Sequence, residues 1–264
     1  MITLSSAELN TWIAAFIWPL TRILGLIATA PLFGNLSIPI RVKVGLGVML
    51  TLVIAPTIPA TAGADPMSLA GLLILIQQLV IGLAMGFAMR LVFAAVEMAG
   101  EIAGLTMGFG FATFFDPQTR ARSSAIAQFL ALLTLMLFLA LNIHLSMLAT
   151  LAESFVTLPI SATPPGGSIF RHIASVGGIV FSSGTQLALP IIAALLVTNI
   201  ALGVLTRAAP QLNLFGIGFP ITLGAGFLVI ALMLPYLAQP LERLFQLGLN
   251  TVGQVANPVY MLKR

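Results

Sequence analysis

Long apolar runs, separated by short linkers rich in glycine, proline or polar residues, are the main pattern along the chain. An α-helix needs about 20 apolar residues to cross the hydrocarbon core of a bilayer. Runs close to that length cover approximately Thr11–Leu32, Val44–Ile58, Leu69–Val96, Ala125–Leu151, Ile173–Leu205 and Ile221–Leu237. Strict alternation of apolar and polar residues is missing, which argues against a β-barrel. The pattern predicts an all-α protein of the integral-membrane type, with about six long apolar segments arranged as helical hairpins.

Proline and glycine predict where these segments break or end. The second segment is short and closes on Pro56 and Pro59, which leaves open whether it spans a membrane. The fifth segment is expected to break at Gly177-Gly178 and at Pro190. The loop around Pro164 is the most turn-like stretch of the chain and the best candidate for a boundary between two halves. The tail after Gln239 is mildly amphipathic.

Composition supports membrane insertion and excludes several kinds of site. Of the 264 residues, 59% are hydrophobic and 7% are charged, and the mean hydropathy is +1.11. The formal charge of +4 includes no basic run with interleaved aromatic residues, so no nucleic-acid partner is expected. The chain has no cysteine, which excludes disulfides and thiolate chemistry. His144 and His172 have no acidic partner at a metal-ligand or triad spacing, so we expect no metal, no cofactor and no enzymatic activity.

The stretch from Gly100 to Arg122 stops resembling a membrane helix. Gly100, Gly104 and Gly108 recur every four residues and would form a smooth strip on which another backbone can pack closely. Gly110 is then expected to loosen the helix, and Pro117 to end it.

Bulky aromatic residues crowd this glycine-rich stretch. They are Phe109, Phe111, Phe114 and Phe115, followed by Asp116 and two arginines. One interpretation is a set of lipid-facing aromatic side chains, and the other is a movable hydrophobic stopper that lines a pore. We favour the pore because non-helical backbone at membrane depth persists only inside protein or beside a cavity.

Charged residues lie on one face of the third segment. At 100° per residue, Arg90, Glu97 and Glu101 fall within about 40° of one another. A charge at membrane depth costs about 2.5 to 3.5 kcal/mol, so each group should pair or face water. The same holds for Arg22 and Glu153. A proton relay is one interpretation, whereas contact with a neighbouring subunit is favoured because the acidic residues cluster at the end of the helix.

Four stretches of the chain resemble one known family. They are WPLTRILGLIATAPLFG from Trp18, IPIRVKVGLGVMLTLVIAP from Ile38, GFGFATFFDPQT from Gly108, and RAAPQLNLFGIGFP from Arg207. Together, and in this order, they resemble the FliR family of flagellar export proteins, which is homologous to the SctT proteins of virulence type III secretion. The resemblance covers nearly the whole chain.

The resemblance implies a non-enzymatic, structural subunit of the type III protein export gate, in the bacterial inner membrane within the flagellar basal body. The implied partners are several copies each of FliP and FliQ, the proteins FlhB and FlhA, unfolded flagellar export substrates and membrane lipid. Residues 1–163 would be FliP-like and carry a plug loop at 106–122, and residues 164–264 would be FliQ-like. The implied pore-plug residues are Phe109, Gly110, Phe111, Phe114, Phe115, Asp116 and Pro117.

A proton-coupled transporter of small solutes is the rival hypothesis. Pro190 and the pair Gly216/Gly218 would then break helices at a binding site near the middle of the membrane. Proton coupling would fall to Arg90, Glu97 or Glu101. A membrane enzyme ranks third, because the chain offers no catalytic constellation.

Overall fold

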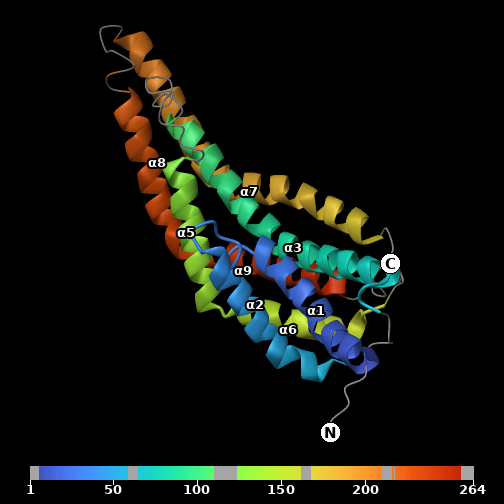
Figure 1. Ribbon diagram of the computed structural model, residues 1–264. Coiled ribbons are helices and arrows are strands. Elements are labelled where there is room, and N and C mark those ends of the chain that lie inside the picture. Colours follow the sequence, from blue (N-terminus) through green and yellow to red (C-terminus); the bar gives the residue numbers. More distant parts are fainter. Residues whose placement is uncertain are drawn as a thin grey trace. The chain divides into compact units, whose positions relative to one another are not determined.

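The computed structural model describes residues 6–58, 65–109, 124–161, 168–209, 216 and 218–256, and the secondary structure in these ranges is helical, without strands (Figure 1). The helices are α1 (Ser6–Thr29), α2 (Ile40–Ile54), α3 (Leu69–Met107), α5 (Ala125–Ala140), α6 (Ile143–Thr157), α7 (Ser168–Ala208), α8 (Phe219–Met233) and α9 (Ala238–Ala256), with short 3₁₀ turns η1 (Ala55–Thr57) and η3 (Leu234–Tyr236). Five helical segments within these ranges are long and apolar enough to cross a membrane, or up to six if the bent pair α5 and α6 forms one span. The prediction of an all-α membrane protein is confirmed.

The structure corrects the predicted course of two segments. The fourth is bent by 65° between α5 and α6, because Asn142 adopts a left-handed conformation with φ of 55°. Asparagine tolerates that conformation better than most residues. The fifth segment is a single helix, α7, which continues through Gly177, Gly178 and Pro190. The predicted breaks at Gly177-Gly178 and at Pro190 are therefore wrong. A glycine inside a helix costs only about 1 kcal/mol relative to alanine, which the rest of a long helix can offset.

The chain forms two compact units, each assembled from separated stretches. The first unit comprises residues 1–91, 138–176 and 245–264, and the second comprises residues 92–137 and 177–244. Helices α3, α5, α7 and α9 contribute residues to both. This grouping of contacts does not test the division at residue 163 that the resemblance implies, which stays a prediction.

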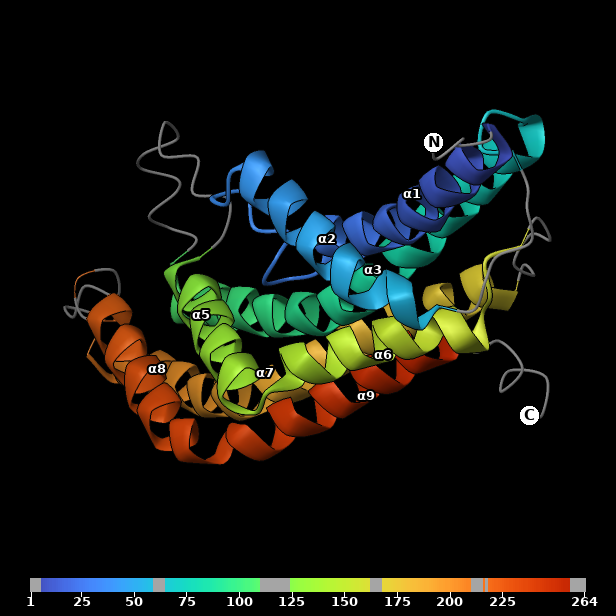
Figure 2. The ribbon, with the colours of Figure 1, turned by 60° about the horizontal axis from the view of Figure 1, so that its bottom comes forward.

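In the first unit, α1 packs closely on the first half of α3 (Figure 2). Glycines make this approach possible: a Cβ atom on Gly25 of α1 would lie 2.8 Å from the carbonyl oxygen of Leu79. At the end of α1 the Thr29 hydroxyl donates to the carbonyl oxygen of Leu83, at 3.1 Å. The fully buried side chains around this contact include Trp18, Ile23, Leu26, Ile27, Ile81 and Met85.

In the second unit, the second half of α3 contacts both α5 and α7. A Cβ atom on Gly184 of α7 would lie 2.8 Å from the carbonyl oxygen of Ala95. Gly100 of α3 faces Ala127 of α5 in the same way, since a Cβ atom there would lie 2.8 Å from the Ala127 nitrogen. Helix α3 is therefore the buried centre of the contacts in this unit.

Candidate functional site

The C-terminal end of α3 is a Schellman motif built on Gly108. The Gly108 amide donates to the Leu105 carbonyl oxygen at 3.1 Å, and the Phe109 amide donates to the Gly104 carbonyl oxygen at 3.0 Å. Gly108 has φ of 94°, a conformation that side chains with a Cβ atom rarely adopt. The structure therefore differs from the sequence prediction: the helix ends at Met107, so Gly108 lies outside the helical strip formed by Gly100 and Gly104.

The N-terminal end of α5 is capped by Ser124. Its hydroxyl oxygen accepts the backbone N–H of Ala127 at 3.1 Å, as an N-cap side chain does. Its own backbone N–H donates to Oε1 of Glu101 in α3, at 2.7 Å. In a capping box that second bond comes from a glutamate three residues after the cap. Residue 127 is alanine, so α3 supplies the missing carboxylate from another helix.

Small residues bring α3 and α5 into backbone contact at this junction. A Cβ atom on Gly104 would lie 2.7 Å from the Ser124 hydroxyl oxygen, and one on Gly100 would collide with the backbone of Ala127. The Ser124 hydroxyl also donates to the Gly100 carbonyl oxygen, at 3.2 Å. Any larger residue at Gly100 or Gly104 would push the two helices apart.

Helix α8 contacts the same end of α3. The ring of Phe109 packs edge-to-face on Phe227, with centroids 6.3 Å apart at an interplanar angle of 88°. The Thr222 hydroxyl approaches the Met107 carbonyl oxygen at 3.4 Å. Gly226 leaves room for the Met107 side chain, since a Cβ atom there would lie 2.5 Å from Cγ of Met107. Phe109 is thus held by α8 where the helical part of α3 stops.

Of the predicted plug residues, only Phe109 belongs to the part of the chain that the structure describes. The others lie outside it: Gly110, Phe111, Phe114, Phe115, Asp116 and Pro117. The structure describes Phe109 and Ser124, the two residues that flank residues 110–123. Both meet Gly104, whose carbonyl accepts the Phe109 amide and whose Cα faces Ser124.

The three residues of the predicted charged stripe have different surroundings. Arg90 and Glu97 are exposed, and no ion pair joins Arg90 to Glu97 or Glu101 in the described structure. Glu101 is half-buried and accepts the Ser124 amide. Ser124 has no recognisable capping signal in the sequence, because the glutamate that completes its cap lies 23 residues earlier rather than at the local spacing.

Arg22, a charged candidate from the sequence, lies in a separate polar cluster in the first unit. It is fully buried, and Nε donates to Oε1 of Gln78 at 2.7 Å. The terminal nitrogens donate to the carbonyl oxygens of Ser154 at 2.8 Å and Leu158 at 2.9 Å. The guanidinium also stacks 4.3 Å from the ring centroid of Phe155.

The Arg22 cluster has a structural purpose. Ser154 and Leu158 lie at the C-terminal end of α6, where the helix dipole is negative. The Ser154 carbonyl accepts the Leu158 amide as well as the arginine, and the Leu158 carbonyl lies just beyond the last helical residue. The arginine therefore caps α6 from α1 and neutralises that end. A proton relay would need a titratable partner, and all the hydrogen-bond acceptors of Arg22 named here are uncharged.

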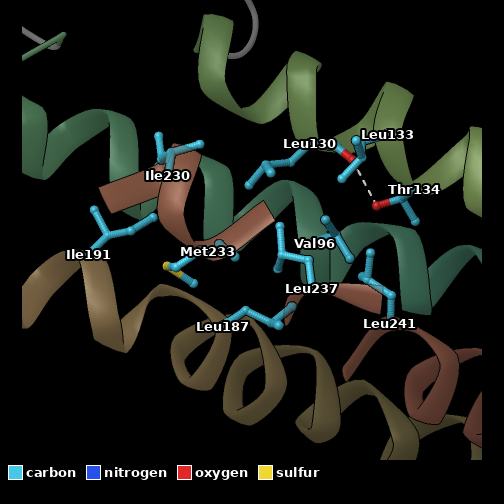
Figure 3. A pocket seen from close by; sticks show the side chains of 11 residues that line it. Val96, Leu130, Leu133, Thr134, Leu187, Ile191, Ile230, Met233, Leu237 and Leu241 are labelled. Atoms are coloured by element: carbon cyan, nitrogen blue, oxygen red, sulfur yellow. Dashed lines mark hydrogen bonds between the residues drawn. The ribbon is translucent and has the colours of Figure 1, made fainter. Parts of the chain in front are cut away.

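A small cavity in the second unit offers little to a polar ligand (Figure 3). It measures about 20 Å³, and ten of its eleven lining residues are apolar, among them Val96, Ile191 and Ile230. The exception is Thr134, whose hydroxyl already donates to the Leu130 carbonyl at 2.7 Å. A buried water needs two to four polar partners, so the cavity is suited to neither water nor a polar solute.

Metal ligands do not cluster in the part of the chain that the structure describes: it holds no group of three or more histidine, aspartate or glutamate residues placed to bind an ion. His144 lies beside the ring of Phe138, with centroids 6.2 Å apart. The side chain of His172 is not among those described.

Comparison with known proteins gives one consistent result. The chain matches the family described as bacterial export proteins, family 1, over residues 13–248. It is 48% identical to the flagellar biosynthetic protein FliR of Pectobacterium carotovorum, over 93% of this chain and 94% of that protein. Its identity to FliR of Escherichia coli is 41%, over 99% of this chain and all of that protein. FliR of Bacillus subtilis is 28% identical over 90% of this chain and 93% of its own length.

The matches to the FliR proteins cover nearly the entire length of this chain and of each relative. The matched region includes the contact between α3 and α5 and the Arg22 cluster. The chain therefore belongs to the FliR family of bacterial flagellar export proteins.

Proposed function

We propose that this chain is a structural subunit of the flagellar type III protein export gate. With FliP and FliQ it would form the channel for unfolded flagellar proteins, in the inner membrane within the flagellar basal body, in contact with FlhB and FlhA. Residues 106–122 would act as a plug, with Phe111, Phe114 and Phe115 closing the pore. No cofactor is needed, because the plug acts by steric and hydrophobic exclusion of water and ions.

The observation that carries the plug proposal is the anchoring of residues 110–123 at both ends. The preceding residue, Phe109, is held by the Schellman motif and by Phe227, and the following residue, Ser124, is held by Gly100 and Glu101. Both ends therefore depend on the last two turns of α3. A plug must be retained at the pore when it is displaced, and two fixed ends supply that retention.

Exposed apolar surface is compatible with burial in a membrane or against other subunits. In an apolar 18-residue window of α7, 17% of the residues are buried within this chain, and in the 18-residue candidate span that begins with α8 the share is 11%. Large apolar side chains on α7 are open to the surroundings, including Phe181, Val197 and Val204, which are 67–69% exposed. Soluble monomers rarely expose contiguous patches of this kind, so lipid or other subunits must cover them.

The transporter hypothesis loses part of its basis. It requires a helix broken at Pro190, whereas α7 is continuous there. The cavity described above also presents no free polar group to a solute. Solute uptake by the purified chain alone would revive this hypothesis.

The assembly part of the proposal is tested by co-expression with the FliP and FliQ of the same organism and extraction in mild detergent. We expect the 27.7 kDa chain to migrate in a large hetero-oligomer of defined native mass containing both partners. A monomer or homodimer under the same conditions would contradict the proposal.

The plug part is tested by deleting Gly110–Phe115 and measuring ion leakage across the cell membrane. We expect the complex to assemble and the membrane to leak. A matched deletion of six residues, Pro59–Ala64, removes a linker of the same length elsewhere and should leave the membrane tight. If cells with the Gly110–Phe115 deletion kept a membrane impermeable to ions, the plug hypothesis would be wrong.

A further inference from the structure

We propose that the exposed face of α8 is a lipid-binding surface: acyl chains of the bilayer cover it from Phe219 to Tyr236, and the hydrocarbon region ends between Tyr236 and Gln239. This inference rests on the proposed function, which puts the chain in a membrane. It adds the surface that the lipid contacts and the level at which that contact ends. The residues that carry the argument, 182–243, all lie within the second unit.

The exposed face of α8 has the composition that acyl chains require. Helix α8 and the turn η3 together form a candidate span of 18 residues, of which 11% are buried within this chain. Its exposed residues, such as Leu228 at 61%, are apolar, glycine or proline until Tyr236 is reached. A protein–protein interface typically includes polar residues and about one hydrogen bond per 100–200 Å². This face offers no side chain for such bonds before Tyr236, so it fits lipid better than a partner subunit.

The length of this face matches a bilayer. Eighteen helical residues extend about 27 Å at roughly 1.5 Å per residue, and the hydrocarbon core is about 30 Å thick. Tyr236, which is 78% exposed, ends the span, and tyrosine is enriched at membrane–water interfaces. The exposed residues of α9 then include Gln239, Glu242 and Arg243. The surface therefore changes from apolar to polar immediately after Tyr236.

Helix α7 shows a similar change. Its exposed residues Ser182, Thr185 and Gln186 are polar. From Leu189 to Leu205, by contrast, the exposed residues are apolar, glycine or proline, with Asn199 as the exception. Two helices of the second unit thus each have a polar stretch beside a long apolar stretch.

The cavity of the second unit shows that the two changes lie at one level (Figure 3). Its lining includes Leu187, which follows Gln186, and Leu237, which comes two residues before Gln239. The last polar residue of one helix and the first of the other are therefore close to the same cavity. The boundary of a bilayer imposes a common level on neighbouring helices, because polar side chains are costly in hydrocarbon.

Asn199 distinguishes α7 from α8. It is exposed near the middle of the apolar stretch of α7, where an amide facing acyl chains would lack hydrogen-bond partners. A neighbouring subunit can supply such a partner, because asparagine bonds across helices in membranes. We therefore assign the lipid to the face of α8 and leave the Asn199 side of α7 to another subunit.

The absence of cysteine from the chain allows a direct test with the variants Leu228→Cys, Asn199→Cys and Glu242→Cys. Each is labelled with bimane in the complex with FliP and FliQ, and the complex is placed in phosphatidylcholine vesicles. One quencher is a nitroxide on the lipid acyl chain, and the other is iodide, which stays in water. The parent complex gives the fluorescence from any cysteines of the partners. The native mass of each labelled complex shows whether it has assembled.

The ratio of quenching by the acyl-chain nitroxide to quenching by iodide should be about tenfold higher at Leu228→Cys than at Glu242→Cys, because hydrocarbon excludes the anion. Asn199→Cys is the matched control: it is exposed within this chain and lies near the middle of an apolar stretch. A label there should respond weakly to both quenchers, because another subunit covers it.

Three results would overturn the inference. Weak quenching of Leu228→Cys by both agents would mean that protein covers α8, and iodide quenching as strong as at Glu242→Cys would mean that water does. Strong acyl-chain quenching at Glu242→Cys would show that the hydrocarbon does not end before Gln239.

Strong acyl-chain quenching at Asn199→Cys would overturn the distinction between α7 and α8. The proposed function fails separately. If no complex forms with FliP and FliQ, but the chain alone in vesicles shows the expected difference between Leu228→Cys and Glu242→Cys, the lipid surface stands and the export-gate proposal is wrong.

Discussion

Helices α3 and α7 are similar in length and in the hydropathy of their apolar spans but differ in how far this chain buries them. They have 39 and 41 residues, and their candidate membrane spans have mean hydropathies of 2.2 and 2.3. Within this chain, however, 61% of the residues in an apolar 18-residue window of α3 are buried, against 17% in such a window of α7. An apolar helix can be covered by its own chain, by lipid or by another subunit, and hydropathy does not distinguish these cases.

The glycines of α3 and α7 show the difference in packing that their hydropathies do not show. Gly82, Gly100 and Gly104 of α3 each lie against the backbone or side chain of a neighbouring helix, so that a Cβ atom would collide. Of the four glycines of α7, Gly184 is packed in this way against Ala95, whereas at Gly177, Gly178 and Gly203 a Cβ atom would meet no neighbouring atom within 4 Å. Close packing needs glycine at the contact points, whereas an open helix face tolerates glycine without requiring it.

The largest effect is expected from a matched pair of substitutions, Gly82→Leu and Gly203→Leu. At Gly82 any side chain would collide with the carbonyl of Arg22 in α1, so we expect Gly82→Leu to separate α1 from α3 and abolish the folded protein. At Gly203 the space is open, and leucine should leave the melting temperature unchanged or raise it slightly. Thermal unfolding in detergent measures both. Equal melting temperatures would show that the glycines do not mark the difference between the helices.

The next effect concerns the polar cluster that lies against α3. Replacing Arg22 by methionine removes the guanidinium donors of Gln78, Ser154 and Leu158. The Ser154 carbonyl keeps the Leu158 amide as a donor, whereas Oε1 of Gln78 and the half-buried Leu158 carbonyl lose the donor described here. Each buried unsatisfied group costs about 1 to 3 kcal/mol, so we expect destabilisation of about 3 kcal/mol. Arg90→Met on the exposed face of α3 is the control and should change stability by no more than about 0.5 kcal/mol. Equal stability of the two variants in denaturant titrations would contradict the capping role of Arg22.

Much of the architecture could be predicted from the sequence because it depends on local composition. The apolar runs gave the helix class and most of the segments. The breaks were less predictable: Asn142 bends the fourth segment through a left-handed residue, while Pro190 stays inside a continuous helix. Asparagine tolerates the left-handed conformation and proline disfavours a helix interior, but neither preference fixes whether a given residue breaks the helix.

The candidate site shows the same limit. The periodicity of Gly100, Gly104 and Gly108 was visible, but the sequence could not show that Gly108 has a positive φ and ends the helix. Glu101 was recognised as a charged residue near the end of a helix, without its partner. Its role depends on Ser124, 23 residues later, and such a pairing has no local sequence signal.

The smallest effect is expected from a substitution on the exposed face of α7, which tests whether lipid or another subunit covers that face. Val197 is 67% exposed within this chain, and Val197→Trp adds apolar bulk at that point. The single chain in detergent should keep its melting temperature, because nothing within the chain is displaced. Overpacking a close interface costs about 1 to 3 kcal/mol, so assembly with FliP and FliQ should weaken by roughly ten- to a hundredfold.

Lipid would respond differently, because acyl chains move aside for an apolar ring. Undiminished assembly of Val197→Trp would therefore assign this face of α7 to the bilayer. Leu195, two residues away, is 1% exposed and supplies the internal control. Leu195→Trp overpacks the chain itself and should lower the melting temperature of the single chain. If both substitutions left the single chain and its assembly unchanged, burial within this chain would not explain the contrast between α3 and α7.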